Sequence, residues 1–386
     1  MTVMRLVGRG SGNTARLARL VLVALVIGGF AVLGSTAMGG SAAGTGATAH
    51  AAKSALISPA RCKRNAAAGT INYISPFGYD AAATIMEVFM AEQLGYFKAM
   101  CLKVAFNASS FTAEQLVSSG RGQVTAIGSA ADHILARAAG ANLTAVATYG
   151  DTDPHAIYAQ SKIKTLKDLE GGQLGYHINV TPAAVAMLDK AGVDVSKVKM
   201  VLLTSYDPTV VTRGQIDAAV GFASNEPLQL KAAGTPFNEF TPKQFGIKGT
   251  YGVMQWNTTF YNKHRAAVAD FMRADLKALD FCIKHKVQCV KYVSHLAAAA
   301  NQGAAFPYGR QLATWNFESQ YVTNTKVGGY GVQTLAEWQT EYQEVLKYGK
   351  LAGLTQSNKV PPLASVLDTK LVAGLYRGKT LIWPGK

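Results

Sequence analysis

The chain has 386 residues and a hydrophobic content of 49%, which is long enough and apolar enough for two domains with sizeable cores. Its 38 Lys and Arg against 23 Asp and Glu give a formal net charge of +15. The basic residues occur in short clusters without an interleaved aromatic stack, a pattern that is weak evidence for a nucleic-acid partner. Surface solvation or docking to an acidic membrane partner explains this charge more simply. The clusters are Lys162–Lys167, Lys197–Lys199, Lys284–Lys291 and Lys347–Lys350.

Residues 1–51 have the order of a secretory signal peptide. Four arginines and no acidic residue come first, followed by an apolar run from Leu20 to Leu33 and by small residues that end in Ala49-His50-Ala51. We expect export with cleavage near Ala51, and a location in the periplasm or on the outer face of the cell membrane. In the alternative interpretation, Leu17–Gly34 stays as an uncleaved anchor.

The four cysteines form an even number, and export permits disulfides. Cys62 and Cys101 each precede a predicted strand, so parallel neighbouring strands would bring them together. Cys282 and Cys289 close a short local loop and are expected to pair. A zinc site is the rival interpretation, because Cys282, His285 and Cys289 share one helix face, although a fourth ligand is not evident.

Residues 52–69 are rich in Ala, Ser and basic residues without periodicity and are predicted to be a linker. A series of strands and helices follows, which predicts a doubly wound, mostly parallel sheet in a first lobe, residues 70–153. The predicted strands are Thr70–Ser75, Leu102–Phe106, Val124–Gly128 and Leu143–Tyr149, and the predicted helices are Ala82–Gly95, Thr112–Ser119 and Ala130–Ala139.

The alternation restarts after Gly150-Asp151-Thr152-Asp153-Pro154, which predicts a second lobe at residues 154–250. Its predicted strands are His155–Ala159, Gln173–His177 and Lys199–Leu203, with a helix at Pro182–Ala191. The stretch Tyr206–Pro227 then predicts a short helix, a glycine turn and an apolar strand. Glu226 comes just past that strand, at the edge where ligands bind in open α/β sheets, whereas Asp217 precedes the strand and is expected to be structural.

The last predicted strand is Tyr251–Trp256, and the C-terminal part is predicted to be helical, with helices at Arg265–His285, Trp315–Tyr321 and Leu335–Lys350. No second series of strands follows, so residues 251–386 are expected to return to the first lobe. Crossovers near 152–156 and 249–253 would then act as hinges around a cleft that closes on a small molecule.

Several of these segments, in this order, resemble the exported solute-binding proteins of the nitrate, sulfonate, taurine and thiamine-pyrimidine-precursor importers. The matching segments are Ala91–Phe97, Thr165–Gly171, Gly214–Ala219 with Asn225–Pro227, and Trp338–Leu351. The resemblance covers residues 70–355. It implies a two-lobe solute-binding fold and reversible ligand capture, and leaves the ligand open.

Ligand-facing side chains are expected between each strand end and the following helix. Phe77 and Tyr79 would stack on a flat ligand, and Asp80 and Glu226 would present carboxylates from both lobes, which favours an amine or ring N–H over an oxyanion. Helix capping is the alternative role of both acids. The predicted ligand-binding residues are Phe77, Tyr79, Asp80, Ser129, Tyr149, His177, Thr181, Tyr206, Asn225 and Glu226.

The expected function is capture of a small nitrogen-containing ligand, similar to a thiamine pyrimidine precursor, for the permease of an ATP-driven importer. An anionic ligand (alkylsulfonate, taurine or nitrate) is the alternative substrate. The resemblance also extends to a pyrimidine-precursor synthase that consumes its own His and holds pyridoxal phosphate on a Lys, but the Cys-rich iron-binding motif of that enzyme is absent here. A sensory module that reports ligand to a membrane partner is a third possibility. We therefore expect a monomeric binding protein with no catalytic residue, metal or cofactor.

Overall fold

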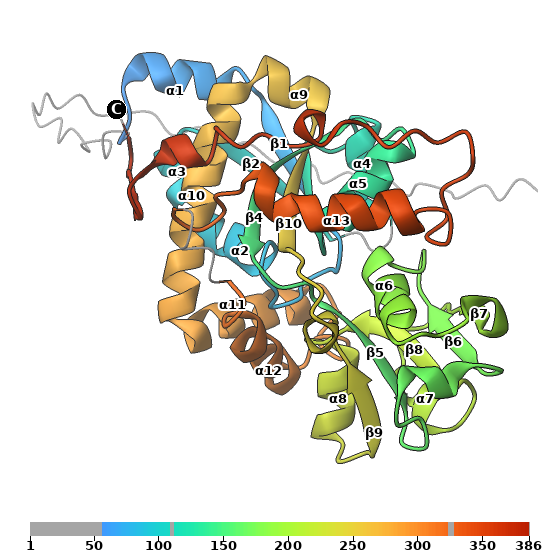
Figure 1. Cartoon of the computed structure of the whole chain (residues 1–386). Helices are drawn as coiled ribbons and strands as arrows, with labels where there is room; N and C mark the ends of the chain where they lie inside the picture. Colours follow the sequence, from blue (N-terminus) through green and yellow to red (C-terminus); the bar gives the residue numbers. More distant parts are fainter. Residues whose placement is uncertain (1–55, 109–111, 323–327, 386) are drawn as a thin grey trace, which may run out of the picture. The chain divides into compact units, whose positions relative to one another are not determined.

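The computed structural model describes residues 56–108, 112–322 and 328–385, which contain two five-stranded sheets interspersed with helices (Figure 1). The predicted signal peptide, residues 1–51, lies outside the described residues. Within those residues, no helix has the length and apolar character needed to cross a membrane. The two sheets with their helices confirm the predicted α/β class with two lobes.

The first sheet has the strand order β2-β1-β3-β10-β4, and we call it with its helices lobe one. Strand β1 pairs in parallel with β2 and β3, whereas β10 pairs antiparallel with β3 and β4. The strands are β1 (Thr70–Ser75), β2 (Lys103–Ala108), β3 (Val124–Ile127), β4 (Leu143–Gly150) and β10 (Tyr251–Asn257).

The second sheet has the order β7-β6-β8-β5-β9, and we call it with its helices lobe two. Strand β6 pairs in parallel with β7 and β8, whereas β5 pairs antiparallel with β8 and β9. The strands are β5 (His155–Gln160), β6 (Gln173–Tyr176), β7 (Lys199–Leu202), β8 (Ala218–Phe222) and β9 (Phe237–Phe240), the last of which the sequence did not predict.

The chain crosses between the sheets twice, through residues 151–154 and through residues 241–250. These crossovers explain why the sheets are mixed, with two parallel and two antiparallel pairings each, and not mostly parallel as predicted. A strand that arrives from the other lobe begins at the edge of the sheet where the parallel strands end, so it runs antiparallel to them. Val253 of β10 accordingly lies beside Ile127 at the end of β3, and His155 of β5 lies beside Phe222 at the end of β8.

Helices surround both sheets. Those of lobe one are α2 (Met86–Gln93), α3 (Tyr96–Ala99), α4 (Ala113–Ser118), α5 (Ala130–Ala138), α9 (Thr258–Lys263), α10 (Arg265–Lys284), α11 (Lys286–Ala299) and α13 (Leu335–Tyr348), and those of lobe two are α6 (Pro182–Lys190), α7 (Thr209–Thr212) and α8 (Glu226–Ala232). Helix α12 (Tyr308–Glu318) contacts both α11 and α8. The remaining short elements are η1 (Leu166–Leu169), η2 (Val195–Lys197), η3 (Pro242–Phe245), η4 (Leu363–Ser365), η5 (Ala373–Leu375), β11 (Tyr376–Arg377) and β12 (Thr380–Leu381).

The predicted linker, residues 52–69, contains a helix, α1 (Pro59–Ala66), which corrects the sequence interpretation. Ser58 caps this helix by accepting a hydrogen bond from the Arg61 N–H, and Pro59 occupies the first helical position. The helix has little apolar surface of its own. It is held by the buried ion pair of Arg61 with Asp270 of α10, a contact between distant parts of the chain that local periodicity does not reveal.

Both predicted cysteine pairs are joined. Cys62 of α1 is bonded to Cys101, just before β2, with 5.2 Å between their Cα atoms. Cys282 and Cys289 are bonded across the α10–α11 junction, with a Cα separation of 5.6 Å. A disulfide removes both thiolates that the rival zinc site would need. Among the described residues, no group of three or more His, Cys, Asp or Glu side chains is arranged to hold a metal ion.

Candidate functional site

Two adjoining cavities lie where β1 and β3 of lobe one and β8 of lobe two end. Chamber one, of about 470 Å³, is lined mainly by residues 76–85, by the loop after β8 and by α12. Chamber two, of about 520 Å³, is lined by the starts of α5, α6 and α8 among others. Five residues line both chambers, namely Phe77, Ile127, Gly128, Tyr206 and Phe222. The volumes are in the range of small-molecule sites.

Aromatic rings from both lobes separate the two chambers. The Phe77 ring meets the Phe222 ring edge to face, with 5.8 Å between centroids, and Phe222 also stacks on His155 at 5.0 Å. Tyr206 stacks on His177 with centroids 3.9 Å apart. A Cβ atom at position 128 would lie 2.8 Å from Phe222, so Gly128 permits this close approach. Flat apolar walls of this kind favour a ligand with a planar ring.

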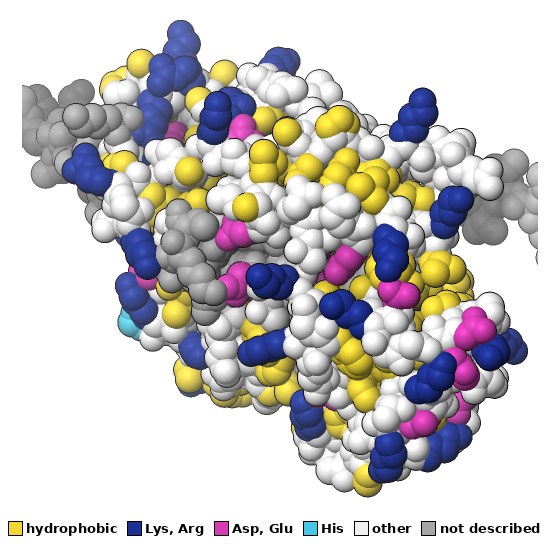
Figure 2. Space-filling model, viewed as in Figure 1, with side chains coloured by type: hydrophobic (Ala, Val, Ile, Leu, Met, Phe, Trp, Pro, Cys, Tyr) yellow, Lys and Arg dark blue, Asp and Glu magenta, His cyan; other side chains and the backbone are white. Residues whose placement is uncertain are grey.

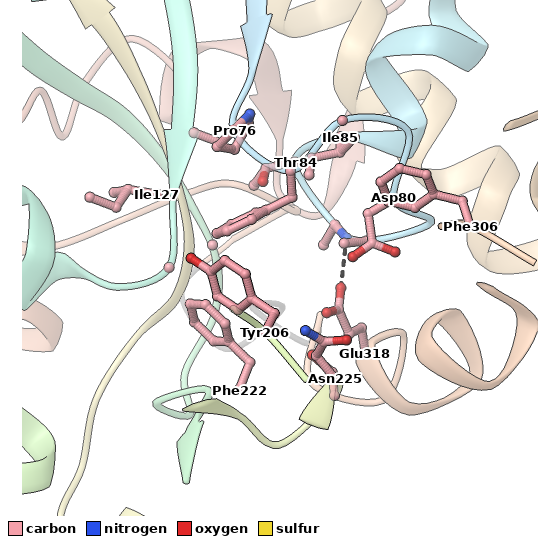
Figure 3. Close-up of a pocket in the computed structure, with 18 of the residues that line it drawn as sticks. Pro76, Asp80, Thr84, Ile85, Ile127, Tyr206, Phe222, Asn225, Phe306 and Glu318 are labelled. Carbon is pink, nitrogen blue, oxygen red and sulfur yellow. Dashed lines mark hydrogen bonds between the residues drawn. The ribbon is translucent and has the colours of Figure 1, made fainter. Parts of the chain in front are cut away.

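Chamber one is lined by two carboxyl groups, those of Asp80 and Glu318, which Figure 3 shows on the same side of the cavity. Oδ1 of Asp80 is buried without a hydrogen-bond partner among the described residues. Burial raises the pKa of Asp80 to about 6, and the nearby Arg310 limits the rise. Burial likewise raises the pKa of Glu318, which is 4% exposed, to about 7. Both groups therefore favour a ligand that supplies hydrogen-bond donors or positive charge.

Chamber two is lined by Glu226 at the first turn of α8, a side chain that is fully buried. Its Oε2 accepts a hydrogen bond from the Phe222 N–H at 3.0 Å, whereas Oε1 is buried without a partner among the described residues. Burial raises the pKa of Glu226 to about 7. Gly221 makes room for this carboxyl, because a Cβ atom there would lie 2.5 Å from Oε2.

The imidazole of His155, which lines chamber two, lies between two acids, Asp132 of α5 and Asp153 of the first crossover. Nδ1 of His155 lies 2.8 Å from Oδ1 of Asp153, and its Nε2 lies 3.8 Å from Oδ2 of Asp132. Burial opposes protonation of His155, but the two carboxylates outweigh it and raise its pKa to about 9. His177 differs, because burial lowers its pKa. The charge of the protonated His155 is thus balanced by the two acids beside it.

Seven of the ten predicted ligand residues line the chambers. Phe77 and Tyr206 line both, Asp80 and Asn225 line chamber one, and His177, Thr181 and Glu226 line chamber two. Thr181 also caps α6, and the Asn225 amide accepts a hydrogen bond from Gln229. Contact of these seven residues with a ligand stays a prediction.

The other three predicted residues line neither chamber, and their contact with a ligand also stays a prediction. Tyr79 packs on Phe89, with centroids 5.4 Å apart. Ser129 is buried and forms a capping box with Asp132 at the start of α5. Tyr149 is buried in lobe one, where its hydroxyl donates a hydrogen bond to Asp275. Each follows a strand or a turn as predicted, but its side chain is used for packing or capping.

Sequence reasoning missed the contribution of α12 and the segment before it. Gln302, Phe306, Arg310 and Glu318 all line chamber one, although this region has no strand-to-helix pattern. Thr84 on the same wall has a φ of 71°, unusual for a β-branched residue. The sequence feature that could have pointed to this region is a cluster of polar residues on a predicted C-terminal helix. That feature does not indicate which cavity the helix lines.

Comparison with known proteins places this geometry in a family. Residues 82–288, more than half of the chain, match the family described as NMT1/THI5 like. A search of curated proteins finds no match. The described fold is nevertheless shared with solved structures of low sequence identity.

The alkanesulfonate-binding protein SsuA from Xanthomonas axonopodis pv. citri, bound to MOPS, is 14% identical with a TM-score of 0.58, over 77% of this chain and 97% of that one. The periplasmic aliphatic sulphonate binding protein SsuA from Escherichia coli is 15% identical with a TM-score of 0.58, over 78% and 98%.

The Candida albicans CA3427 product, described as having the generic periplasmic binding protein fold, is 15% identical with a TM-score of 0.52, over 82% of this chain and 98% of that one. Identities of this size establish a common fold and leave the ligand open. The two-lobe architecture, the cleft between the strand ends and the family match lead to one conclusion: the chain belongs to the NMT1/THI5-like family and has the periplasmic-binding-protein fold.

Proposed function

We propose that the protein is an exported solute-binding protein that captures a small nitrogen-containing ligand, similar to a thiamine pyrimidine precursor, for an ATP-driven importer. The observation that carries this proposal is the pair of buried carboxyl oxygens without a partner among the described residues, Oδ1 of Asp80 and Oε1 of Glu226. They come from different lobes and line chambers with aromatic walls. In either chamber, a flat ligand with N–H groups would satisfy the unpaired carboxyl oxygen and pack on the aromatic walls.

An anionic ligand has less support from the residues present. Arg310 is the one Lys or Arg side chain among the described residues that line either chamber. The protonated His155 is paired with Asp153. An incoming sulfonate would face Asp80 and Glu318 in chamber one and Glu226 in chamber two, so it would have to overcome repulsion from several carboxyl groups. The relatives that bind sulfonates therefore guide the fold assignment, and the lining residues guide the choice of ligand.

A synthase-like enzyme also has less support. The described residues that line the two chambers include no lysine that could carry pyridoxal phosphate. A role in binding needs no such group. We extend the proposal to a monomer that works with a membrane permease outside the cytoplasm, with no nucleic-acid partner. Figure 2 supports the last point, because Lys and Arg side chains are spread over the visible face and do not gather in one patch.

Native mass spectrometry of freshly purified protein, followed by isothermal titration with pyrimidines, riboflavin, taurine and alkylsulfonates, tests the proposed function. We expect a pyrimidine with an exocyclic amine to bind in one-to-one stoichiometry and more tightly than taurine. Binding of none of these compounds, or tighter binding of a sulfonate than of every pyrimidine, would contradict the nitrogen-ligand assignment. The second outcome would leave the solute-binding role in place and change its ligand.

Affinity for a cationic or N–H-donating ligand should rise with pH between about 5.5 and 8. The raised pKa values of Asp80, about 6, and Glu226, about 7, mean that both carboxyls are largely protonated at the lower limit and ionised at the upper one. A protonated carboxyl must lose its proton when the ligand binds. Below the pKa of each carboxyl, the affinity for the ligand therefore falls by up to about tenfold per pH unit. Titrations in buffers with different ionisation enthalpies would measure this release, and an affinity that rises on acidification would contradict it.

A further inference from the structure

The segment between β1 and α2 contains a strained residue on the wall of chamber one. Thr84 has a φ of 71°, a conformation that is unfavourable for a β-branched residue. Glycine would adopt it without strain, yet the chain has Thr at this position. Strain of this kind clusters at ligand-binding sites, and the position of Thr84 on the chamber wall fits that pattern.

Buried neighbours hold Thr84 in this conformation. Its N–H donates to Oε1 of Glu87 at 2.5 Å, and its carbonyl accepts a hydrogen bond from the Tyr73 hydroxyl at 2.7 Å. Glu87 and Tyr73 are both fully buried. The Thr84 methyl group faces β10, because a Cβ atom on Gly252 would lie 3.0 Å from Cγ2 of Thr84. The core of lobe one therefore fixes both backbone polar groups and the methyl group of Thr84.

The hydroxyl of Thr84 is the group that remains for a ligand. It forms no hydrogen bond with any described residue, and it is not among the enclosed polar atoms that lack a partner. Two N–H groups of the same segment are already occupied, because the Ala81 N–H donates to Oε1 of Gln311 at 2.6 Å and the Ala83 N–H donates to Oε2 of Glu318 at 2.8 Å. The Thr84 hydroxyl is therefore available as a hydrogen-bond donor to chamber one.

A hydrogen-bond acceptor belongs to the same segment. Oδ1 of Asp80 is buried without a partner among the described residues, and Asp80 lines chamber one together with Thr84. Figure 3 shows both residues on the segment that follows β1, at the border of the cavity. An ionised carboxyl accepts a hydrogen bond from an N–H group, whereas a hydroxyl can donate one to a lone pair. This wall therefore matches a ligand that carries a donor and an acceptor, such as an aminopyrimidine ring.

We propose that Thr84 is a specificity-determining residue of chamber one, whose hydroxyl donates a hydrogen bond to an acceptor atom of the ligand. The ligand class is thereby narrowed to planar nitrogen heterocycles that carry an unprotonated ring nitrogen as well as an N–H group. This inference rests on the proposed function, in that chamber one receives the solute. The strained backbone holds the hydroxyl in place before the ligand arrives, which lowers the entropy lost on binding.

The test compares the unchanged protein with Thr84→Val, which keeps the branched shape and loses the hydroxyl, and with Thr84→Ser, which keeps the hydroxyl. Thr144→Val, near the start of β4 and outside both chambers, is the matched control. The probes are 4-aminopyrimidine, which has an amine and ring nitrogens, and aniline, which has the amine without a ring nitrogen. Isothermal titration at pH 8 would measure both affinities.

Thr84→Val should weaken binding of 4-aminopyrimidine about tenfold and leave binding of aniline unchanged, because only the first ligand loses a hydrogen bond. Thr84→Ser should retain the affinity for both ligands, and Thr144→Val should change neither. If Thr84→Val does not fold, Thr84→Gly takes its place with the same expected loss for 4-aminopyrimidine, because glycine adopts the positive φ without strain.

Three results would overturn the role of Thr84: unchanged binding of 4-aminopyrimidine by Thr84→Val, an equal loss for both ligands, or a loss in Thr84→Ser as large as that in Thr84→Val. An equal loss would indicate that Thr84 only shapes the chamber wall. Failure of the unchanged protein to bind 4-aminopyrimidine would contradict the nitrogen-ligand assignment and the role of Thr84 together. Normal binding by the unchanged protein and by every variant would contradict only the role of Thr84.

Discussion

Replacing Asp270 with Ala should lower the free energy of unfolding by about 3–5 kcal/mol, the usual cost of leaving one charge of a buried ion pair without its partner. Arg61 is 7% exposed, and its Nε donates to Oδ2 of Asp270 at 2.8 Å. The Asn65 amide donates to the same oxygen at 2.7 Å. Removing the carboxyl therefore leaves a buried guanidinium without its carboxylate, and the Asn65 amide keeps only its second acceptor, the Met100 carbonyl.

Urea denaturation of the oxidised protein, followed by circular dichroism, would measure this change. Asp280→Ala on the same helix is the matched control, because Asp280 pairs with Lys284 at the surface, where ion pairs contribute little. The disulfide from Cys62 still tethers α1 in both variants. Equal destabilisation by the two substitutions would show that the buried pair is not what holds α1 against α10.

Replacing Glu226 with Gln should weaken binding of a cationic or N–H-donating ligand on the order of ten- to a hundredfold, because a hydrogen bond to a charged acceptor becomes one to a neutral amide. The amide oxygen can still accept the Phe222 N–H, so the local fold is expected to remain. Affinity for methanesulfonate should not fall. Isothermal titration at pH 8, where Glu226 is ionised, would measure both effects.

The same variant should be more stable than the unchanged protein at pH 8. A carboxyl whose pKa is raised on folding binds its proton more tightly in the folded state, so its contribution to stability falls as pH rises from about 4.5 to about 7. The Gln side chain does not ionise, so the variant does not lose stability over this pH range. Glu239→Gln, an acid paired with Lys231 outside both chambers, is the control. Weaker binding together with lower stability would indicate that Glu226 is only structural.

Strand positions were largely predictable from the sequence, because most strands are short runs rich in apolar residues, such as β1, which Gly69 precedes and Pro76 follows. Strand β1 begins and ends as predicted, at Thr70 and Ser75, and β5 and β10 each extend one residue past the predicted end. Strand direction was not predictable, since a run of apolar residues does not indicate whether the strand is parallel or antiparallel to its neighbours. Helix α1 was missed because its stability depends on Asp270, 209 residues away.

The edge of the cleft was predictable for a different reason. Side chains that follow parallel strands gather at one edge of a sheet, so Asp80 and Glu226 were placed at the cleft from chain order alone. Which of these side chains turns into the cavity depends on packing. Tyr149 ends its strand beside the cleft, yet its hydroxyl bonds Asp275 in the core of lobe one. The sequence did not predict that Glu318 lines the cleft, because only the tertiary fold brings α12 to the cleft.

The place of β10 in the first sheet has a consequence for the order in which the protein folds. Strands β3 and β4 do not pair with each other, because β10 lies between them and bonds to both. The sheet of lobe two is built from residues 155–240, whereas that of lobe one needs residues 251–257 as well. During synthesis, lobe two can therefore close its sheet first, and lobe one stays divided until a strand made after lobe two has been inserted.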